Sequence, residues 1–154
     1  MAGFRIREAV RTDFPRLLSI DQDCFTQNIA YDAEELVYFM NRQHSRTLVA
    51  EVERQIVGFL LDDIEAPHSH RSVATLVTLD VLEFMRRSGI GTALLDHSER
   101  TLRRKGVSRY QLQVDIKNST AIEFYRRAGF MVLKILEGYY GSGTDAFLME
   151  KMLL

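Results

Sequence analysis

The sequence has little cysteine and no excess of charge of either sign. Cys24 is the only cysteine among 154 residues, so the chain can form neither an internal disulfide nor a thiolate metal cluster, and we expect a reducing, cytoplasmic location. Twenty Lys and Arg residues against 21 Asp and Glu residues give a formal net charge of −1. This balance gives no general attraction toward nucleic acid or anionic lipid, so we expect neither a nucleic-acid nor a membrane partner.

Long apolar runs and chain breakers are scarce as well. The longest aliphatic run, residues 56–61, is far shorter than the roughly 20 residues that cross a bilayer. Arg5 and Arg7 lie where a signal peptide has its apolar core. With two prolines, no repeat and no linker, and with 46% hydrophobic and 27% charged residues, residues 1–154 are expected to form one globular domain.

Local patterns predict the elements of the first half. Residues 4–7 alternate apolar and polar side chains like a half-buried strand, and residues 12–15 look like the start of a helix with a polar cap and an early proline. Asp32 and Glu35 have the spacing of a capping box and begin a second helix. Three β-rich runs, which we expect to pair antiparallel, follow at residues 47–52, 56–61 and 72–81.

The second half alternates helices and strands. Residues 86–91 open a helix that ends at Gly106. Residues 110–116 have a period of two, which places three polar side chains on one face of a strand: Gln111, Gln113 and Asp115. Asn118 caps another helix, and strands are predicted at residues 130–136 and 146–152. This order implies an α/β fold with a mixed sheet flanked by helices.

The residues that follow the third β-rich run carry the clearest chemical signal. A strand ending near Val81 leads into Arg86-Arg87-Ser88-Gly89-Ile90-Gly91-Thr92 and then into a helix. Backbone N–H groups and the positive end of the helix converge there, which suits a pyrophosphate. The arginines can add charge-assisted hydrogen bonds. Spacing alone also fits a solvated loop before an ordinary helix, and the stretch lacks both the dinucleotide fingerprint and the Gly-Lys-Ser/Thr of a P-loop.

Taken with two further segments, this stretch resembles the GNAT superfamily of N-acetyltransferases. The acetyl-CoA pyrophosphate loop of that family reads Arg/Gln-x-x-Gly-x-Gly/Ala, and residues 86–91 are similar to it. Residues 118–130 look like the second family signature, and residues 137–149 look like the C-terminal segment of the RimI-like branch of N-terminal protein acetyltransferases. The resemblance covers essentially the whole chain. It implies a single-domain, mostly antiparallel twisted sheet whose fourth and fifth strands splay apart to admit acetyl-CoA.

The resemblance also implies residues that bind acetyl-CoA, the expected co-substrate, without a metal. The main chain of Leu79 and Val81 would hold the pantetheine arm, and Asn118 would contact the cofactor in addition to capping its helix. The pyrophosphate would be bound by the loop residues Arg86, Arg87, Ser88, Gly89, Ile90, Gly91 and Thr92.

Tyr125 matches the tyrosine that, in the family, protonates the leaving CoA thiolate. A hydroxyl donor near the sulfur stabilises the negative charge that develops as the tetrahedral intermediate collapses. The alternative is that Tyr125 only packs on its helix.

No general base stands at the positions where relatives carry one. Gln113 aligns with the Glu or His on the fifth strand, and Thr75 aligns with a tyrosine found in some relatives; neither can take a proton. Gln113 can still hold a water or the amine by hydrogen bonds. Asp115 is the nearest carboxylate on the same face, although a solvated Asp at a strand end explains it as well. The missing base favours an amine with a low pKa.

The resemblance places the acceptor between two aromatic segments. Tyr139 and Tyr140 resemble the tyrosine pair that receives the peptide backbone in N-terminal acetyltransferases; the alternative is a packing role at a strand end. Phe25 to Tyr31 would form the other wall, but this stretch lacks the proline of several relatives. His68 and His70 have no further placed ligand, so no metal site is expected.

These residues lead to an expected function with two alternatives. We expect acetyl-CoA-dependent transfer to a primary amine, most specifically the N-terminal α-amine of a protein or peptide, by direct attack on the thioester. Direct attack leaves no role for Cys24 as a nucleophile, and it is expected to be a small buried side chain. The first alternative is a small-molecule amine: a polyamine, an amino acid or an aminoglycoside. The second is an acyl-CoA-binding module with little turnover, which the absence of a base at Gln113 and Thr75 would explain.

Overall fold

The computed structural model describes residues 3–26, 29–67, 69, 71–141 and 143–153. His68 and His70 lie outside the described residues, as do Gln27 and Asn28 of the segment expected to wall the acceptor site. The strands and helices follow the predicted order closely. The strands are β1 (Arg5–Glu8), β2 (Ser45–Val52), β3 (Gln55–Glu65), β4 (Val73–Val81), β5 (Arg109–Asp115), β6 (Met131–Leu136) and β7 (Ala146–Met152). The helices are α1 (Phe14–Cys24), α2 (Ala33–Met40), α3 (Ile90–Arg104) and α4 (Ser119–Arg127), with short 3₁₀ turns η1 (Arg11–Asp13) and η2 (Glu83–Met85).

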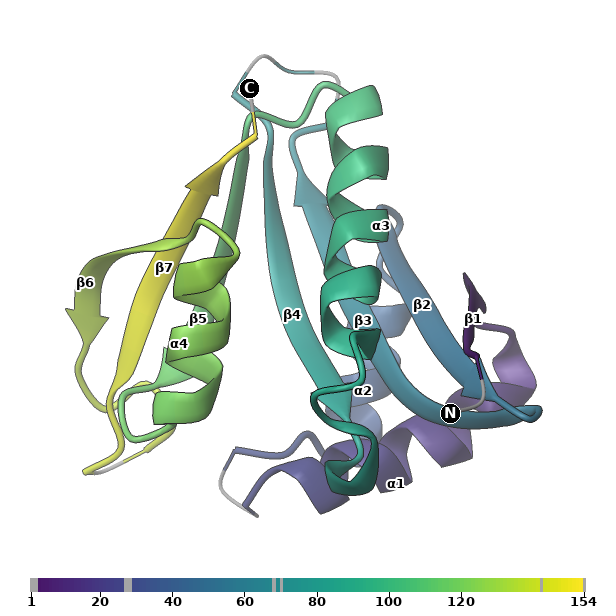
Figure 1. Ribbon diagram of the computed structural model, residues 1–154. Coiled ribbons are helices and arrows are strands. Elements are labelled where there is room, and N and C mark those ends of the chain that lie inside the picture. The colour runs from purple at the N-terminus through teal and green to yellow at the C-terminus, as the bar shows by residue number, and fades with distance from the viewer. Residues whose placement is uncertain (1–2, 27–28, 68, 70, 142, 154) are drawn as a thin grey trace. The chain divides into compact units, whose positions relative to one another are not determined.

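Hydrogen bonds link the seven strands in the order β1-β2-β3-β4-β5-β7-β6, which confirms the predicted mixed sheet flanked by helices (Figure 1). β4 and β5 run parallel and are in register at Val73–Thr75 and Arg109–Gln111, near the start of each strand. The other registered pairs, β1–β2, β2–β3, β5–β7 and β6–β7, are antiparallel. No helix of the described residues is long and apolar enough to cross a bilayer.

The chain divides into two compact units, and the first comprises residues 1–63 and 76–101. Nine successive residues of β3, from Ile56 to Ile64, are buried. Other elements must therefore cover both faces of this strand. Figure 1 shows α3 on the near side of β3 and α2 on the far side. The core of this unit comes from every layer and includes Leu17, Ile20, Leu36, Leu48, Phe59, Leu60, Leu61, Leu94 and Leu95.

The β2–β3 hairpin is confirmed, and its turn is one residue shorter than the gap between the predicted strands. Val52 pairs with Gln55, so only Glu53 and Arg54 form the turn. Both have positive φ, 50° and 66°, the backbone of a turn whose twist matches that of the paired strands. Gln55, placed in the gap by the sequence pattern, is therefore the first residue of β3.

The second unit comprises residues 64–75 and 102–154. β5 and β7 pair along their whole lengths, from Arg109 opposite Met152 to Asp115 opposite Ala146. The rings of Tyr110 and Phe130 meet in its core, with centroids 5.7 Å apart, and a second contact of 5.7 Å joins Phe130 to Tyr125 of α4. α4 is thereby fixed through its aromatic face.

Candidate functional site

The predicted pyrophosphate loop connects β4 to α3 in the first unit. Two of its residues have positive φ, Arg87 at 62° and Gly89 at 87°, so the chain turns sharply just before the helix. The first helical hydrogen bond runs from Ala93 N to Gly89 O at 2.9 Å. The N–H groups of residues 90–92 therefore have no acceptor within the helix, and they form the positive helix end that an anion requires.

Hydrogen bonds within the loop hold it in shape. Met85 N donates to Leu82 O at 2.9 Å and Arg86 N to Glu83 O at 3.1 Å, while the Ser88 hydroxyl donates to Met85 O. A Cβ at Gly89 would meet nothing within 4 Å, so its positive φ, and not crowding, explains the glycine. The loop thus fits the pyrophosphate group of acetyl-CoA: it offers main-chain donors and has arginines beside it.

The main-chain N–H and C=O groups of successive β4 residues point alternately to the two edges of the strand. Leu82 N donates to Val57 O of β3 at 2.9 Å, and a Cβ on Gly58 of β3 would lie 2.8 Å from Asp80 O. The main chain of residues 80 and 82 therefore faces β3. Because successive residues of a strand alternate, the opposite edge is formed by Val77, Leu79 and Val81.

Two carbonyls on this opposite edge of β4 accept hydrogen bonds from side chains. The Tyr31 hydroxyl donates to Val77 O at 3.4 Å, and Arg86 Nε donates to Val81 O at 2.9 Å. Leu79 lies between them on the same edge. Arg86 is expected to contact phosphate; its Nε is bonded to the end of β4, and the phosphate contact stays a prediction.

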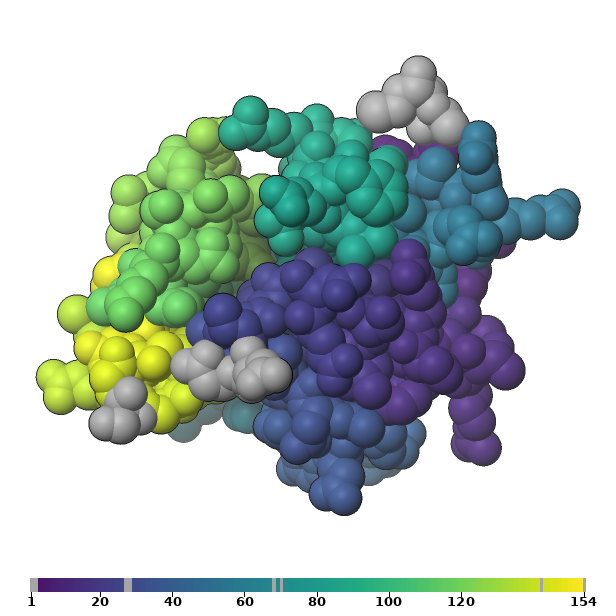
Figure 2. Space-filling model, turned by 90° about the horizontal axis from the view of Figure 1, so that it is seen from below, coloured from purple at the N-terminus to yellow at the C-terminus, as the bar shows by residue number. Residues whose placement is uncertain are grey.

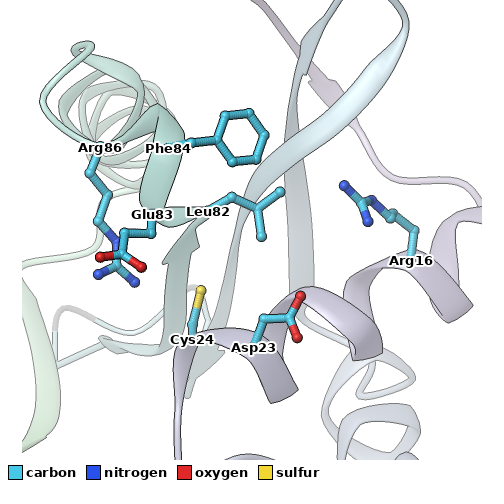
Figure 3. A pocket seen from close by; sticks show the side chains of 7 residues that line it. All are labelled: Arg16, Asp23, Cys24, Leu82, Glu83, Phe84 and Arg86. Atoms are coloured by element: carbon cyan, nitrogen blue, oxygen red, sulfur yellow. The ribbon is translucent and has the colours of Figure 1, made fainter.

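A hollow of about 530 Å³ lies next to this loop, between α1 and the residues that follow β4. Figure 3 shows Arg16, Asp23 and Cys24 on α1, with Glu83, Phe84 and Arg86 opposite. Cys24 Sγ lies 3.6 Å from Val81 O, and burial raises the pKa of the Cys24 thiol to about 11. The thiol is therefore protonated near neutral pH, and Cys24 is half-buried, less buried than expected. In the space-filling view of Figure 2, α1 (purple) lies beside the loop that follows β4 (teal).

The second unit carries the predicted catalytic residues. Tyr125 on α4 is 7% exposed, and its ring meets Phe124 and Phe130 edge-on at 5.3 and 5.7 Å. Asn118 Oδ1 accepts from Ala121 N at 3.1 Å, which confirms its role as the helix cap. Its contact with the cofactor stays a prediction.

The polar face of β5 is confirmed. Gln111, Gln113 and Asp115 are half-exposed, whereas the residues between them are buried. Gln111 Nε2 donates to Glu150 Oε2 at 2.7 Å. Asp115 Oδ1 accepts from Lys117 N at 3.0 Å, so this carboxylate stabilises the turn that follows β5.

The tyrosine pair lies against the same strand. The Tyr140 hydroxyl donates to Gln113 O at 3.4 Å, and the rings of Tyr139 and Tyr140 are 4.9 Å apart and perpendicular. Burial, Tyr139 and the charge of Asp115 raise the pKa of Tyr140 well above its ordinary value. Tyr140 is therefore a hydrogen-bond donor near Gln113 and not a base.

In the first unit, Phe25 and Tyr31 are the two ends of the segment expected to form one wall of the acceptor site. Phe25 N donates to Asp21 O at 3.1 Å and ends α1. Tyr31 N donates to Asp21 Oδ2 at 2.7 Å, and its ring packs against Phe39 at 5.3 Å. Asp21 was not predicted as a site residue, because nothing in its local sequence distinguishes it from the exposed acids of a surface helix.

The model of the Acetyltransferase (GNAT) family matches residues 14–130, three quarters of the chain and all of the loop described above. The chain belongs to the GNAT acetyltransferase family. This GNAT enzyme is therefore an N-acetyltransferase, and acetyl-CoA is its co-substrate. Within the described ranges there is no group of three or more His, Cys, Asp or Glu residues able to hold a metal ion.

Individual relatives agree with this assignment. An N-alpha-acetyltransferase of Sulfurisphaera tokodaii is 34% identical over 97% of this chain and 93% of its own. The crystal structure of Ard1 from Thermoplasma volcanium covers 98% of both chains with a TM-score of 0.84 and 26% identity. The ribosomal-protein-S18-alanine N-acetyltransferase of Escherichia coli has a TM-score of 0.86 at 23% identity, over 98% of this chain and 94% of that one, a likeness of fold. The GNAT enzyme is thus similar to proteins of the N-terminal acetyltransferase branch.

Proposed function

We propose that the enzyme transfers an acetyl group to the N-terminal α-amine of a protein or peptide, with residues 1–154 acting as one N-acetyltransferase domain. The observation that carries the proposal is the amide side chain of Gln113, which cannot take a proton, on the face of β5 where Asp115 is the nearest carboxylate. Gln113 does not titrate, Asp115 is bonded to Lys117 N, and the Tyr140 hydroxyl keeps its proton. The similarity to N-alpha-acetyltransferases supports the same acceptor.

An amine that attacks without a base must already be neutral. At pH 7 an α-amine with a pKa near 8 is roughly one-tenth neutral, whereas a lysine amine with a pKa near 10.4 is roughly one part in 2,500 neutral. The difference of roughly 200-fold favours the α-amine before any contact with the acceptor is considered. Proximity of the neutral amine to the thioester carbonyl then supplies the largest share of the rate.

The individual roles follow from the chemistry of each side chain. The N–H groups of the loop from Arg86 to Thr92 bind the pyrophosphate, and the main chain of Leu79 and Val81 binds the pantetheine arm. Asn118 contributes a further cofactor contact. The Tyr125 hydroxyl protonates the leaving thiolate and becomes a phenolate, and the proton that the acetylated nitrogen loses restores the hydroxyl.

Four aromatic side chains are assigned to acceptor binding: Phe25 and Tyr31 in the first unit, and Tyr139 and Tyr140 in the second. In the second unit, Gln113 can hold the amine or a water by hydrogen bonds.

A panel of acceptors tests the proposal. Initial rates of CoA release are measured with peptides that have a free α-amine, with the same peptides acetylated at the N-terminus but containing a lysine, and with polyamines, amino acids and an aminoglycoside. We expect turnover with the free α-amine peptides. A higher kcat/KM for a small amine would establish the first alternative, and acetyl-CoA binding without turnover of any acceptor would establish a binding module.

The pH dependence of the rate tests the absence of a base separately. For two peptides with different α-amine pKa values, the inflection should follow the pKa of each substrate, and Gln113→Glu should extend activity to lower pH by supplying a proton acceptor. One fixed inflection for both peptides, abolished in Asp115→Asn, would identify Asp115 as the base.

A further inference from the structure

Three polar side chains form a buried cluster between α1 and β4 that the acetyl-transfer chemistry does not use. Asp21, Thr78 and Asp80 are 0%, 5% and 1% exposed. Thr78 Oγ1 lies 2.5 Å from Asp80 Oδ1 and 3.4 Å from Asp21 Oδ1. Asp80 occupies the face of β4 opposite to Leu79 and Val81, so it lies behind the strand expected to hold the pantetheine arm.

The cluster holds a proton on one of its two carboxyl groups. A hydroxyl has one proton, so Thr78 can donate to only one of the two carboxyl groups that it contacts. Two ionised carboxylates at this depth would repel each other without solvent screening. The oxygen Asp80 Oδ2 has no hydrogen-bond partner among the described residues, whereas Asp21 Oδ2 accepts the Tyr31 N–H at 2.7 Å, the length of a charge-assisted bond. The proton is therefore placed on Asp80.

Titratable neighbours on the adjacent elements agree with this assignment. Burial and Asp21 raise the pKa of Asp80 well above its ordinary value, and the Thr78 hydrogen bond and the Arg86 charge oppose that rise only in part. On α1 the Cys24 thiol is protonated and adds no charge near Asp80.

Asp21 binds the backbone of Tyr31, and the side chain of Tyr31 contacts β4. The Tyr31 N–H is bonded to Asp21, and the Tyr31 hydroxyl is bonded to Val77 O on the β4 edge that also carries Leu79. The Phe39 ring supports the Tyr31 ring from α2. Removing the Asp21 carboxylate would leave the aromatic contact and the hydroxyl bond but release the backbone at Tyr31.

We propose that Asp21, packed against Thr78 and Asp80, is a positioning residue that holds Tyr31 in place for the acceptor. This inference rests on the proposed function, since Tyr31 is assigned there to the acceptor site. Asp21 acts through Tyr31 and does not itself contact substrate.

The test compares Asp21→Ala, which removes the acceptor of the Tyr31 N–H, with Asp21→Asn, which keeps a neutral acceptor. Amide hydrogen exchange at Tyr31 should accelerate roughly tenfold or more in Asp21→Ala and less in Asp21→Asn, because a hydrogen bond to a charged group is lost in the first and weakened in the second. The KM for peptide should rise in the same order while the KM for acetyl-CoA stays within about twofold. Glu34→Gln removes the same charge from an exposed residue of α2 and is the control. It should alter neither the exchange rate at Tyr31 nor the KM for peptide.

Several outcomes would contradict the proposal. Tyr31 exchange at the parent rate in both Asp21 variants would show that Asp21 does not position it, and an equal rise in both KM values would show a structural role only. If Asp21→Ala does not fold, Asp21→Asn decides alone by the same two measurements. If the parent acetylates no peptide, the proposed function fails, while hydrogen exchange at Tyr31 still decides whether Asp21 holds this residue.

Stability against pH tests the location of the proton. A carboxyl group whose pKa is raised in the folded state stabilises that state fully below its unfolded pKa, and this contribution is lost as pH rises through the folded pKa. Asp80→Asn should therefore remove part of the fall in unfolding free energy that the parent shows as pH rises above the ordinary pKa of an aspartate. A fall unchanged in Asp80→Asn, but removed in Asp21→Asn, would place the proton on Asp21 and overturn the assignment.

Discussion

Gly89→Ala should weaken acetyl-CoA binding through the backbone of the loop. Gly89 has φ of +87°, which an alanine reaches only at a cost of about 1–2 kcal/mol, while its Cβ would meet nothing within 4 Å. The variant should therefore fold, and the turn should relax to relieve the strain at residue 89. Relaxation reorients the N–H groups of residues 90–92, and one lost bond to a phosphate oxygen costs about 1.5–3 kcal/mol, or at least tenfold in Kd.

Gly106→Ala is the matched control for this measurement. Gly106 follows the other end of α3, has φ of +78° and also has nothing within 4 Å of a Cβ. Chemical denaturation should show similar losses of stability in both variants, and calorimetry should show a weaker Kd for acetyl-CoA only in Gly89→Ala. A Kd within about twofold of the parent, in a folded Gly89→Ala protein, would refute the assignment of the loop to the pyrophosphate.

Two further substitutions test the catalytic acid and the close packing of β3 against β4. Tyr125→Phe keeps the ring contacts but removes the proton donor, so steady-state kinetics should show kcat lower by roughly 10²–10⁴-fold with the KM for acetyl-CoA unchanged; a rate within about twofold of the parent would leave Tyr125 a packing role. Gly58→Ala puts a Cβ 2.8 Å from Asp80 O and should lower the unfolding free energy by about 1–3 kcal/mol. Gly3→Ala, whose Cβ has open space, is the control in urea denaturation, and equal stability of the two would contradict the close approach of β3 to β4.

Elements defined by local signals could be predicted from the sequence. The capping box of Asp32 and Glu35, the Asn118 cap and the alternation along β5 depend on neighbours in the chain, and the structure confirms each. The glycine-spaced loop was likewise readable, because a strand, a turn and a helix start follow one another directly.

Features formed by residues distant in sequence could not be predicted. Asp21 and Thr78 are 57 positions apart, and only the packing of α1 on β4 brings their side chains together. Two further hydrogen bonds depend on tertiary geometry in the same way: Arg86 Nε to Val81 O, and the Tyr140 hydroxyl to Gln113 O. Hydrophobic patterns identify which face of an element is buried, but they do not identify which polar groups meet inside.

The site of acetylation on a single peptide tests the central claim most directly. A peptide with one free α-amine and one internal lysine is incubated with acetyl-CoA and the enzyme near pH 7, and tandem mass spectrometry locates the added group. Because the α-amine has a neutral fraction roughly 200-fold larger, we predict the acetyl group on the N-terminal residue, with lysine modified only slowly at alkaline pH. Acetylation mainly at the lysine would contradict the account.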